Sequence, residues 1–88
     1  MSDTESPLKF PCVFPIKAMG RVTPDFESTV TTIVFSHAEP DAGEAVSVNY
    51  SGQGNFQSVT VTVIATSREQ LDRIYQDLTD CEQVLMAL

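Results

Sequence analysis

The most regular feature of the chain is a period-two alternation of apolar and polar residues, which is typical of β-strands with one buried face. It is clearest over residues 56–65, where three valines stand at alternate positions. Residues 46–51 and 84–88 alternate in the same way over shorter stretches. Three strands are therefore predicted over these ranges. The glycine-rich segment 52–55 fits a hairpin turn between the first two of them.

A further strand is predicted near the start of the chain, from Phe14 to Gly20. Pro11 and Pro15 lie before and within its beginning, and neither can donate a backbone hydrogen bond to a neighbouring strand. Residues 10–15 are therefore expected to form only an edge-like or bulged lead-in.

A helix is predicted to begin at Thr23 as N-cap, with Pro24 at the first helical position and Asp25 beside the positive end of the helix dipole. The residues that then recur with helical spacing are Phe26, Val30, Ile33, Val34 and His37. Because several β-branched residues lower the helix propensity here, the periodicity and the start signal together favour helix over strand. The segment Glu39–Gly43 is expected to be a loop.

A second helix is predicted over residues 67–79. Ser67 and Gln70 have the spacing of a capping box, in which each side chain bonds a free backbone N–H group at the helix start. The apolar stripe that follows consists of Leu71, Ile74, Tyr75 and Leu78.

The predicted order of elements is strand, helix, strand, strand, helix, strand, which is typical of the α+β ferredoxin-like fold βαββαβ. In this fold a four-stranded antiparallel sheet with the strand order 4-1-3-2 has both helices on one face. The sheet residues expected to face the helices are Ile16, Ala18, Val46, Val48, Tyr50, Val59, Val61, Val63, Val84 and Met86.

Length and composition fit one folded domain preceded by a short tail. The 88 residues suffice for a single hydrophobic core, and 42% hydrophobic with 19% charged residues is ordinary for a globular protein. Residues 1–9 are polar and without periodicity, so we expect a disordered tail before a domain over 10–88. The tail lacks the basic and apolar regions of a signal peptide, so a cytoplasmic location is expected.

The charge of the chain excludes two classes of partner. Twelve acidic and five basic residues give a net charge of −7, whereas nucleic acids and anionic membranes are bound through Lys and Arg. No apolar run approaches the roughly 20 residues that span a bilayer. Five of the acids lie within 69–82, so the negative charge is expected mainly on the second helix and the loops.

Cysteine and histidine are too few for a metal centre. The chain has Cys12, Cys81 and the single His37, without a Cys-x-x-Cys pair, whereas zinc and iron–sulfur sites need about four ligands. No cofactor is expected. The predicted topology places the two cysteines at opposite ends of the sheet, so both are expected to be free thiols.

Six short motifs occur in a characteristic order: Phe10-Pro11, Phe14-Pro15, Ile16–Gly20, His37-Ala38, Gly54–Val59 and Val84–Leu88. Together, over about residues 10–88, they resemble the YbeD-like family of small bacterial proteins. The resemblance implies a ferredoxin-like fold similar to the ACT-type regulatory domains that sense amino acids. It implies no established activity; the roles suggested for the family are regulatory, one of them in lipoate metabolism.

The corner between the first strand and the first helix is a candidate ligand-binding site, formed by Gly20, Arg21 and Thr23. A helix N-terminus beside an arginine can bind an anion, and the ACT likeness implies an amino-acid effector near this loop. The alternative is structural: Gly20 permits a tight turn and Arg21 is a solvated surface charge. The sequence favours this alternative.

The sheet face away from the helices is a candidate interaction surface. Its expected members are Lys17, Met19, Ser47, Asn49, Thr60, Thr62, Ile64, Leu85 and Ala87. A mixed surface with exposed apolar area can bind a second copy or another protein. An ordinary solvated face of an antiparallel sheet is an equally good interpretation.

His37 is interpreted as a structural residue, because a cation at the end of a helix complements its negative dipole end. The acids Glu39, Asp41 and Glu44 lack the spacing of an EF-hand and fit a solvated loop. The carboxylates of the second helix are likewise expected to face solvent.

The preferred function is that of a small non-enzymatic regulatory or adaptor domain, with a small-molecule effector or a protein partner. RNA recognition is excluded because none of the positions expected to stack bases, Lys17, Met19, Ser58, Thr60 and Thr62, is aromatic. A metal chaperone is excluded because the loop after the first strand lacks cysteines. The alternative is a phosphate-handling enzyme of acylphosphatase type that uses Arg21 and Asn55. The glycine-rich phosphate loop of that family is missing, which argues against it.

Overall fold

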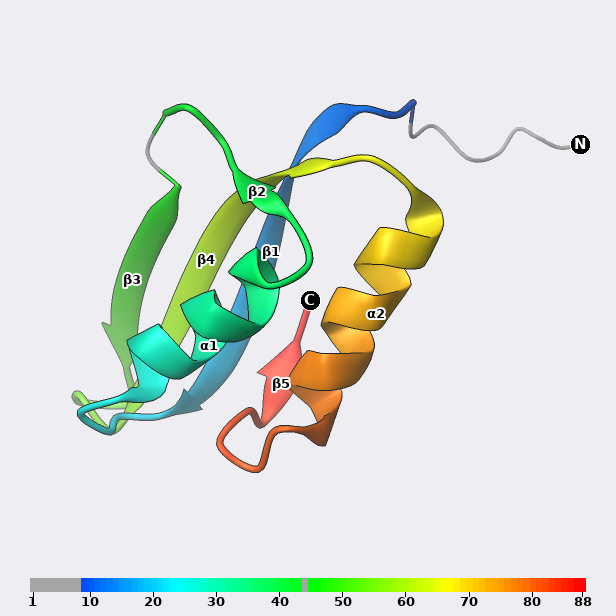
Figure 1. The fold of residues 1–88 in the computed structure, drawn as a ribbon. Coiled ribbons are helices and arrows are strands. Elements are labelled where there is room, and N and C mark those ends of the chain that lie inside the picture. The colour runs from blue at the N-terminus through cyan, green and yellow to red at the C-terminus, as the bar shows by residue number, and fades with distance from the viewer. Residues whose placement is uncertain (1–8, 44) are drawn as a thin grey trace, which may run out of the picture.

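An antiparallel sheet forms one layer of the protein, and two helices pack across one of its faces in a second layer (Figure 1). This computed structural model describes residues 9–43 and 45–88. The elements are β1 (Cys12–Arg21), α1 (Phe26–Phe35), β2 (Glu39–Pro40), β3 (Val46–Ser51), β4 (Phe56–Ala65), α2 (Arg68–Asp80) and β5 (Met86–Ala87). The predicted α+β class is therefore confirmed. All of the expected tail except Lys9 lies outside the described residues.

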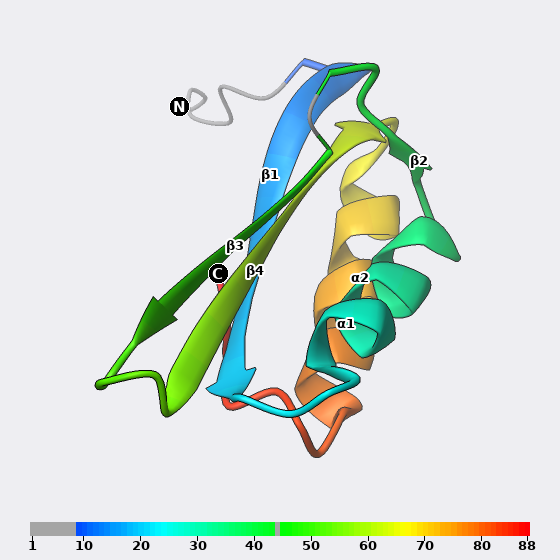
Figure 2. The same ribbon diagram turned by 90° about the vertical axis from the view of Figure 1, so that its left-hand side faces the viewer.

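The two long strands β1 and β4 form the centre of the sheet. They pair without interruption from Cys12 opposite Ala65 to Arg21 opposite Phe56. β5 pairs with the free edge of β1, and β3 with the free edge of β4. Turned by a quarter, the molecule shows the sheet and the two helices as separate layers (Figure 2).

β1 is longer than the sequence predicts, because it already begins at Cys12. The expected bulge is absent, since pairing with β4 is unbroken, but the first residues of β1 do form an edge on the side away from β4. The backbone of Lys17 exchanges hydrogen bonds with Leu88 beside β1, so Pro15, two residues earlier, faces the same side. The donor that Pro15 lacks is therefore not needed for pairing with β4. This explains why a proline is tolerated inside a ten-residue strand.

The segment predicted as the loop 39–43 contains the two-residue strand β2. Glu39 and Pro40 pair with Ile64 and Val63 of β4. The next backbone groups continue along the same edge, since Thr62 accepts from Asp41 N–H and donates to the carbonyl of Ala45. β2 and β3 thus follow one another along the same edge of β4. β2 is the fifth strand, which the sequence did not predict.

The helix starts differ in how they are capped. α2 is close to prediction: the Ser67 side chain accepts a hydrogen bond from the Gln70 N–H group. α1 begins at Phe26, after Asp25, and has no side-chain cap, so the prediction of Thr23 as N-cap was wrong. The Thr23 hydroxyl lies 3.1 Å from the side-chain oxygen of Gln83 and equally far from the Asp25 carboxylate.

The core lies between the sheet and the helices. Its fully buried side chains with the largest volumes are Phe26, Ile16, Ile74, Leu78, Val30, Val34, Val59, Val61 and Val63. Gln57 is the polar residue buried among the described ones, and its Nε2 donates to the Arg21 carbonyl at 3.5 Å. The predicted core faces of both helices and both central strands are therefore confirmed.

Two residues predicted to face the helices are exposed. Tyr50 pairs with Gln57 on the helix side of the sheet, but 64% of its surface is exposed because β3 extends beyond the helices (Figure 1). In β5 the predicted phase is reversed: Ala87 pairs with Ala18 and packs on the core, whereas Met86 is exposed. A five-residue segment leaves the phase of its alternation poorly determined.

Gly20, near the end of β1, lies in close contact with the start of α1 and with the segment before β5. A Cβ atom at this position would be 2.3 Å from the Gln83 carbonyl oxygen and 2.5 Å from the Phe26 ring. The residue therefore fits a close approach between the end of β1, the start of α1 and the segment before β5. The structure thus gives Gly20 a packing role.

Gly20→Ala is expected to destabilise the fold, because overpacking against a backbone carbonyl and a buried ring cannot relax easily. A loss of about 1–3 kcal/mol in unfolding free energy is expected by urea denaturation. Gly43→Ala is the control: Gly43 is exposed, and the atom nearest to an added Cβ is the Asp41 carboxylate oxygen at 3.3 Å, the end of a flexible side chain that can move aside, so its effect should stay within about 0.5 kcal/mol. Equal effects of both variants would contradict the packing role.

Candidate functional site

The corner between β1 and α1 contains a shallow hollow of about 240 Å³. It is lined by Arg21, Thr23, Glu82, Gln83 and Leu85. The structure thus brings two of the predicted ligand residues, Arg21 and Thr23, together with residues that sequence reasoning missed. No local signal could have found them, because Glu82 and Gln83 are about 60 residues further along the chain.

The polar groups of this corner are already engaged. The Arg21 guanidinium stacks on the Phe56 ring, 5.3 Å from its centroid, and the Thr23 hydroxyl is bonded within the protein. The Asp25 carboxylate and Glu27 lie at the start of α1, where they oppose the binding of an anion. The corner can hold a small polar molecule, but it is poorly suited to a phosphate.

Arg21 and Asn55, the pair of the acylphosphatase alternative, come from neighbouring loops. The backbone N–H group of Val22 donates to the Asn55 carbonyl at 3.1 Å. The two loops lie close together because backbone pairing continues by one step beyond the ends of β1 and β4. Nothing further in this arrangement supports a phosphate site.

The sheet face away from the helices, here called the open face, is formed by alternate residues of the strands. From the pairings of β1 and β4, its members there are Val13, Pro15, Lys17, Met19, Arg21, Phe56, Ser58, Thr60, Thr62 and Ile64. β3 adds Ser47, Asn49 and Ser51, and β5 adds Met86. Of the predicted interaction residues, Lys17, Met19, Thr60, Thr62 and Ile64 do lie together here.

Leu85 and Ala87 do not belong to the open face. Leu85 lines the hollow beside Arg21, and Ala87 packs on the core. Val13 and Met86 take their place as exposed apolar residues, with 57% and 53% of their surfaces exposed. The face therefore has more accessible apolar surface near its ends than the sequence indicates.

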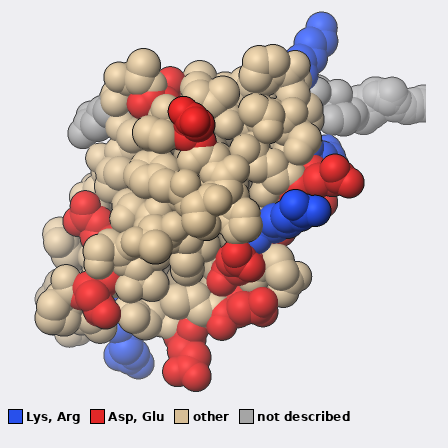
Figure 3. Space-filling model, viewed as in Figure 1, with Lys and Arg blue, Asp and Glu red and all other residues tan. Residues whose placement is uncertain are grey.

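Charge is distributed unequally between the two sides of the molecule. β1, β3, β4 and β5 contribute Lys17 and Arg21 to the open face and no carboxylate. Glu39 of β2, which pairs with Ile64, lies at its corner. On the helix side, acidic side chains lie around the rim and near the end of α2 (Figure 3). The open face is thus the least negative side of a chain with a net charge of −7.

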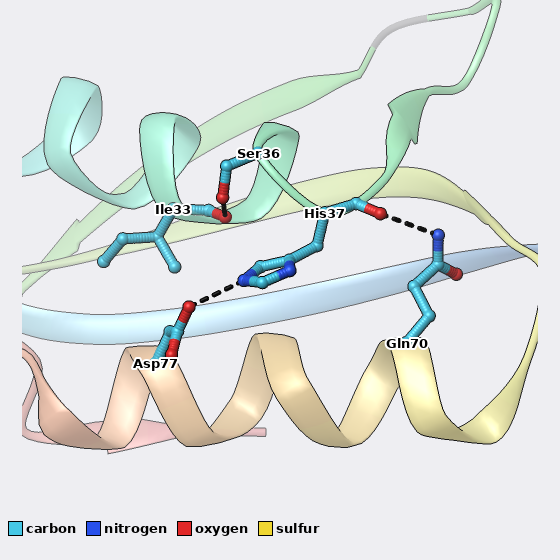
Figure 4. Close-up of polar contacts among 5 residues, drawn as sticks. All are labelled: Ile33, Ser36, His37, Gln70 and Asp77. Atoms are coloured by element: carbon cyan, nitrogen blue, oxygen red, sulfur yellow. Dashed lines mark hydrogen bonds and ion pairs between the residues drawn. The ribbon is translucent and has the colours of Figure 1, made fainter.

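A second and larger hollow, of about 520 Å³, lies where the end of α1 meets the start of α2. Its lining is Phe35, Ser36, His37, Ala38, Glu39, Pro40, Ile64, Thr66 and Gln70. His37 Nε2 is 2.6 Å from the Asp77 carboxylate on α2 (Figure 4). The predicted structural role of His37 thus has a specific partner, which the sequence could not identify across 40 positions.

Gln70 connects the two helices near this hollow. Its Nε2 donates to the His37 carbonyl at 2.9 Å (Figure 4), and its Oε1 accepts from the Thr66 N–H group at 2.8 Å. The second bond is a capping-box contact displaced by one residue. One side chain therefore satisfies backbone groups at the end of α1 and at the start of α2.

Gln70→Ala is expected to lower the unfolding free energy by about 1–2 kcal/mol, because it leaves a part-buried carbonyl and a helix-start donor without their partners. Hydrogen exchange of the Thr66 amide should accelerate as well. Gln76→Ala is the matched control, since Gln76 bonds only the Asp80 side chain on the exposed face of the same helix. A loss as small as that expected for the control, within about 0.5 kcal/mol, would contradict this role.

Tyr75 is the described residue whose ionisation is clearly perturbed. It is half-buried on α2 against the core, and this burial raises the pKa of its phenol above the usual 10.0 by desolvation of the charged form. Its place against the core is that of a packing residue.

The folded protein should hold the Tyr75 proton to higher pH than the unfolded chain does. Stability should therefore fall as pH rises through and above the usual tyrosine pKa. In a Tyr50→Phe variant, the absorbance of tyrosinate should report Tyr75 alone, with a pKa above 10.0. Tyr75→Phe should remove this part of the alkaline loss. Titration of Tyr75 at its ordinary value would refute the prediction.

Neither a metal site nor a membrane span is found among the described residues. They contain no cluster of three or more His, Cys, Asp or Glu side chains placed to hold a metal ion. No helix over the same ranges is long and apolar enough to cross a bilayer. Cys12 and Cys81 are free thiols, as predicted, and both are partly buried.

Comparison with known proteins gives family and fold but no activity. A family model described as "Protein of unknown function (DUF493)" matches residues 5–88. A UPF0250 protein of Chromobacterium violaceum is 48% identical over 90 residues, which cover 100% of both chains. Another from Paraburkholderia phytofirmans is 45% identical over 99% of this chain and 98% of its own.

Among solved structures, the protein HP0495 of Helicobacter pylori has a similar fold. One solution structure of it superposes with a TM-score of 0.74 at 18% sequence identity, covering 100% of this chain and 93% of that one. At such low identity the likeness shows the fold alone.

Proposed function

Because this chain belongs to the DUF493 family of small bacterial proteins of unknown function, we propose from its own surface that it is a non-enzymatic adaptor domain that binds another protein through the open face. We further propose that it acts in the cytoplasm, which suits two free thiols. The observation that supports the adaptor role is the composition of the open face.

The open face combines exposed apolar surface with positive charge. Val13 and Met86 are more than half exposed near its two ends, and Lys17 lies between them on β1, opposite Thr60. Thr60 and its neighbours Ser58 and Thr62 on β4 place hydroxyl groups along one side of the lysine, where they can hydrogen-bond a partner. An interface that forms and dissociates is about as apolar as the rest of a protein surface, so this mixed composition fits one.

The partner is expected to present acidic and aliphatic side chains. Lys17 and Arg21 attract carboxylates, while the acids on the helix side repel an acidic partner that approaches from that side. Two copies stacked by their open faces would bring like charges together, which argues against self-association through this face. The partner is therefore a different protein.

An effector site at the β1–α1 corner has weaker support. The space beside Gly20 is occupied by the Gln83 carbonyl and the Phe26 ring. The hydroxyl of Thr23 and the guanidinium of Arg21 have partners within the chain. An enzyme has weaker support still, since the described residues show no nucleophile beside a base. Binding of another protein remains the function that the surface supports best.

Affinity capture from extracts of the native host tests the proposal. The bait should be the wild type, Lys17→Glu on the open face, and Arg73→Glu on α2, where Arg73 is exposed. The two variants change charge equally on opposite layers. Reversal of Lys17 should lower recovery of a bound protein by about tenfold or more, whereas Arg73→Glu should not. Binding should also weaken with salt.

Loss of the same protein with both variants would contradict the role of the open face, and so would its retention by Lys17→Glu. Circular dichroism of each variant should confirm that the fold is intact, as expected for exposed positions. A supporting partner is one with an acidic surface that binds the purified wild type directly.

A further inference from the structure

The two edges of the sheet differ in how they are protected from pairing with another strand. An edge strand exposes free N–H and C=O groups that can template pairing, and proteins commonly block it with proline, charge or a short strand. On the β1 side, β5 is only two residues long and Pro15 removes a donor from the open part of β1. That edge is blocked.

The opposite edge, formed by β3, has none of these protections. Its six residues, Val46–Ser51, contain no proline and no charged side chain. Among the described residues β3 pairs with β4 alone, and it stands at the outer edge of the sheet, away from both helices (Figures 1 and 2). This edge therefore has free backbone donors and acceptors and no charged side chain of β3 to keep another strand away.

We propose that β3 pairs antiparallel with β3 of a second copy, so that two sheets join edge to edge. The uncharged strand supports a second copy as the occupant, since self-pairing brings no carboxylates of β3 together. The contact is isologous, because the same six residues are used by both chains. The helices of both copies then lie on one side of the joined sheet, and both open faces lie on the other.

The backbone geometry specifies the register of this contact. The Ala45 carbonyl accepts from Thr62 of β4, so odd-numbered residues of β3 face β4 and even-numbered ones face outward. The outward groups belong to Val46, Val48 and Tyr50. They are all used when Val48 lies opposite Val48 of the second copy, which gives up to about six hydrogen bonds between the chains.

The side chains fit the same register. Val46 then lies opposite Tyr50 of the second copy, an aromatic and β-branched pair of the kind that stabilises neighbouring strands. The tyrosine ring, 64% exposed in the single chain, gains an apolar neighbour. On the open face, Ser47 lies opposite Asn49 of the second copy. A single six-residue edge is a small interface, so the dimer is expected to be weak and dependent on concentration.

Sedimentation equilibrium tests the dimer, at concentrations up to about 1 mM, where weak specific contacts are populated. Tyr50→Pro removes an outward donor without touching a bond to β4, and should raise the dissociation constant about tenfold or more. Tyr50→Val keeps the N–H group and should raise it only about threefold. Circular dichroism and thermal unfolding should show both variants folded.

Disulfide trapping tests the register, in chains where Cys12 and Cys81 are replaced by alanine. Because residues 47 and 49 of the two copies form a close, non-hydrogen-bonded pair, a mixture of Ser47→Cys and Asn49→Cys chains should cross-link efficiently. Either variant alone should cross-link several-fold less.

A strictly monomeric protein would overturn the proposal. So would a dimer that Tyr50→Pro does not weaken, or equal cross-linking in the mixture and in the single variants. Lys17→Glu should leave dimerisation unchanged, which separates this contact from binding through the open face.

Discussion

The continuous pairing of β1 with β4 is the interaction on which the rest of the structure depends. These two strands lie in the centre of the sheet, and every other strand joins one of their outer edges. Their alternate residues supply one surface to the helices and the other to solvent. Because a shift of one residue would exchange these two surfaces, the same register sets both the hydrophobic core and the composition of the open face.

Sequence reasoning succeeded where a pattern repeats often. The alternation along β4 and the apolar stripe of α2 each have enough members to fix the buried face, and the capping residue Ser67 marks the helix start. It failed where a segment is short, as at β5 and β2, because two residues carry no period. The start of α1 was misplaced because Thr23 bonds Gln83, a contact across the fold that local propensity cannot indicate.

The candidate sites were predictable to different degrees for the same reason. Lys17, Thr60 and Thr62 could be placed on one face because strand periodicity determines which way each side chain points. The lining of the corner hollow could not, because Glu82 and Leu85 approach Arg21 only after the chain turns back behind α2. His37 and Asp77 likewise meet across two helices.

Pro15 limits how large an assembly of this protein can become. A sheet with two open edges can add chains on both sides and grow into a fibre, whereas a sheet with one open edge stops after a single addition. By removing a donor from the exposed stretch of β1, this residue leaves the molecule with one side for strand addition. Any assembly by strand pairing is therefore finite, which keeps a small β-rich protein from forming polymers when it is abundant.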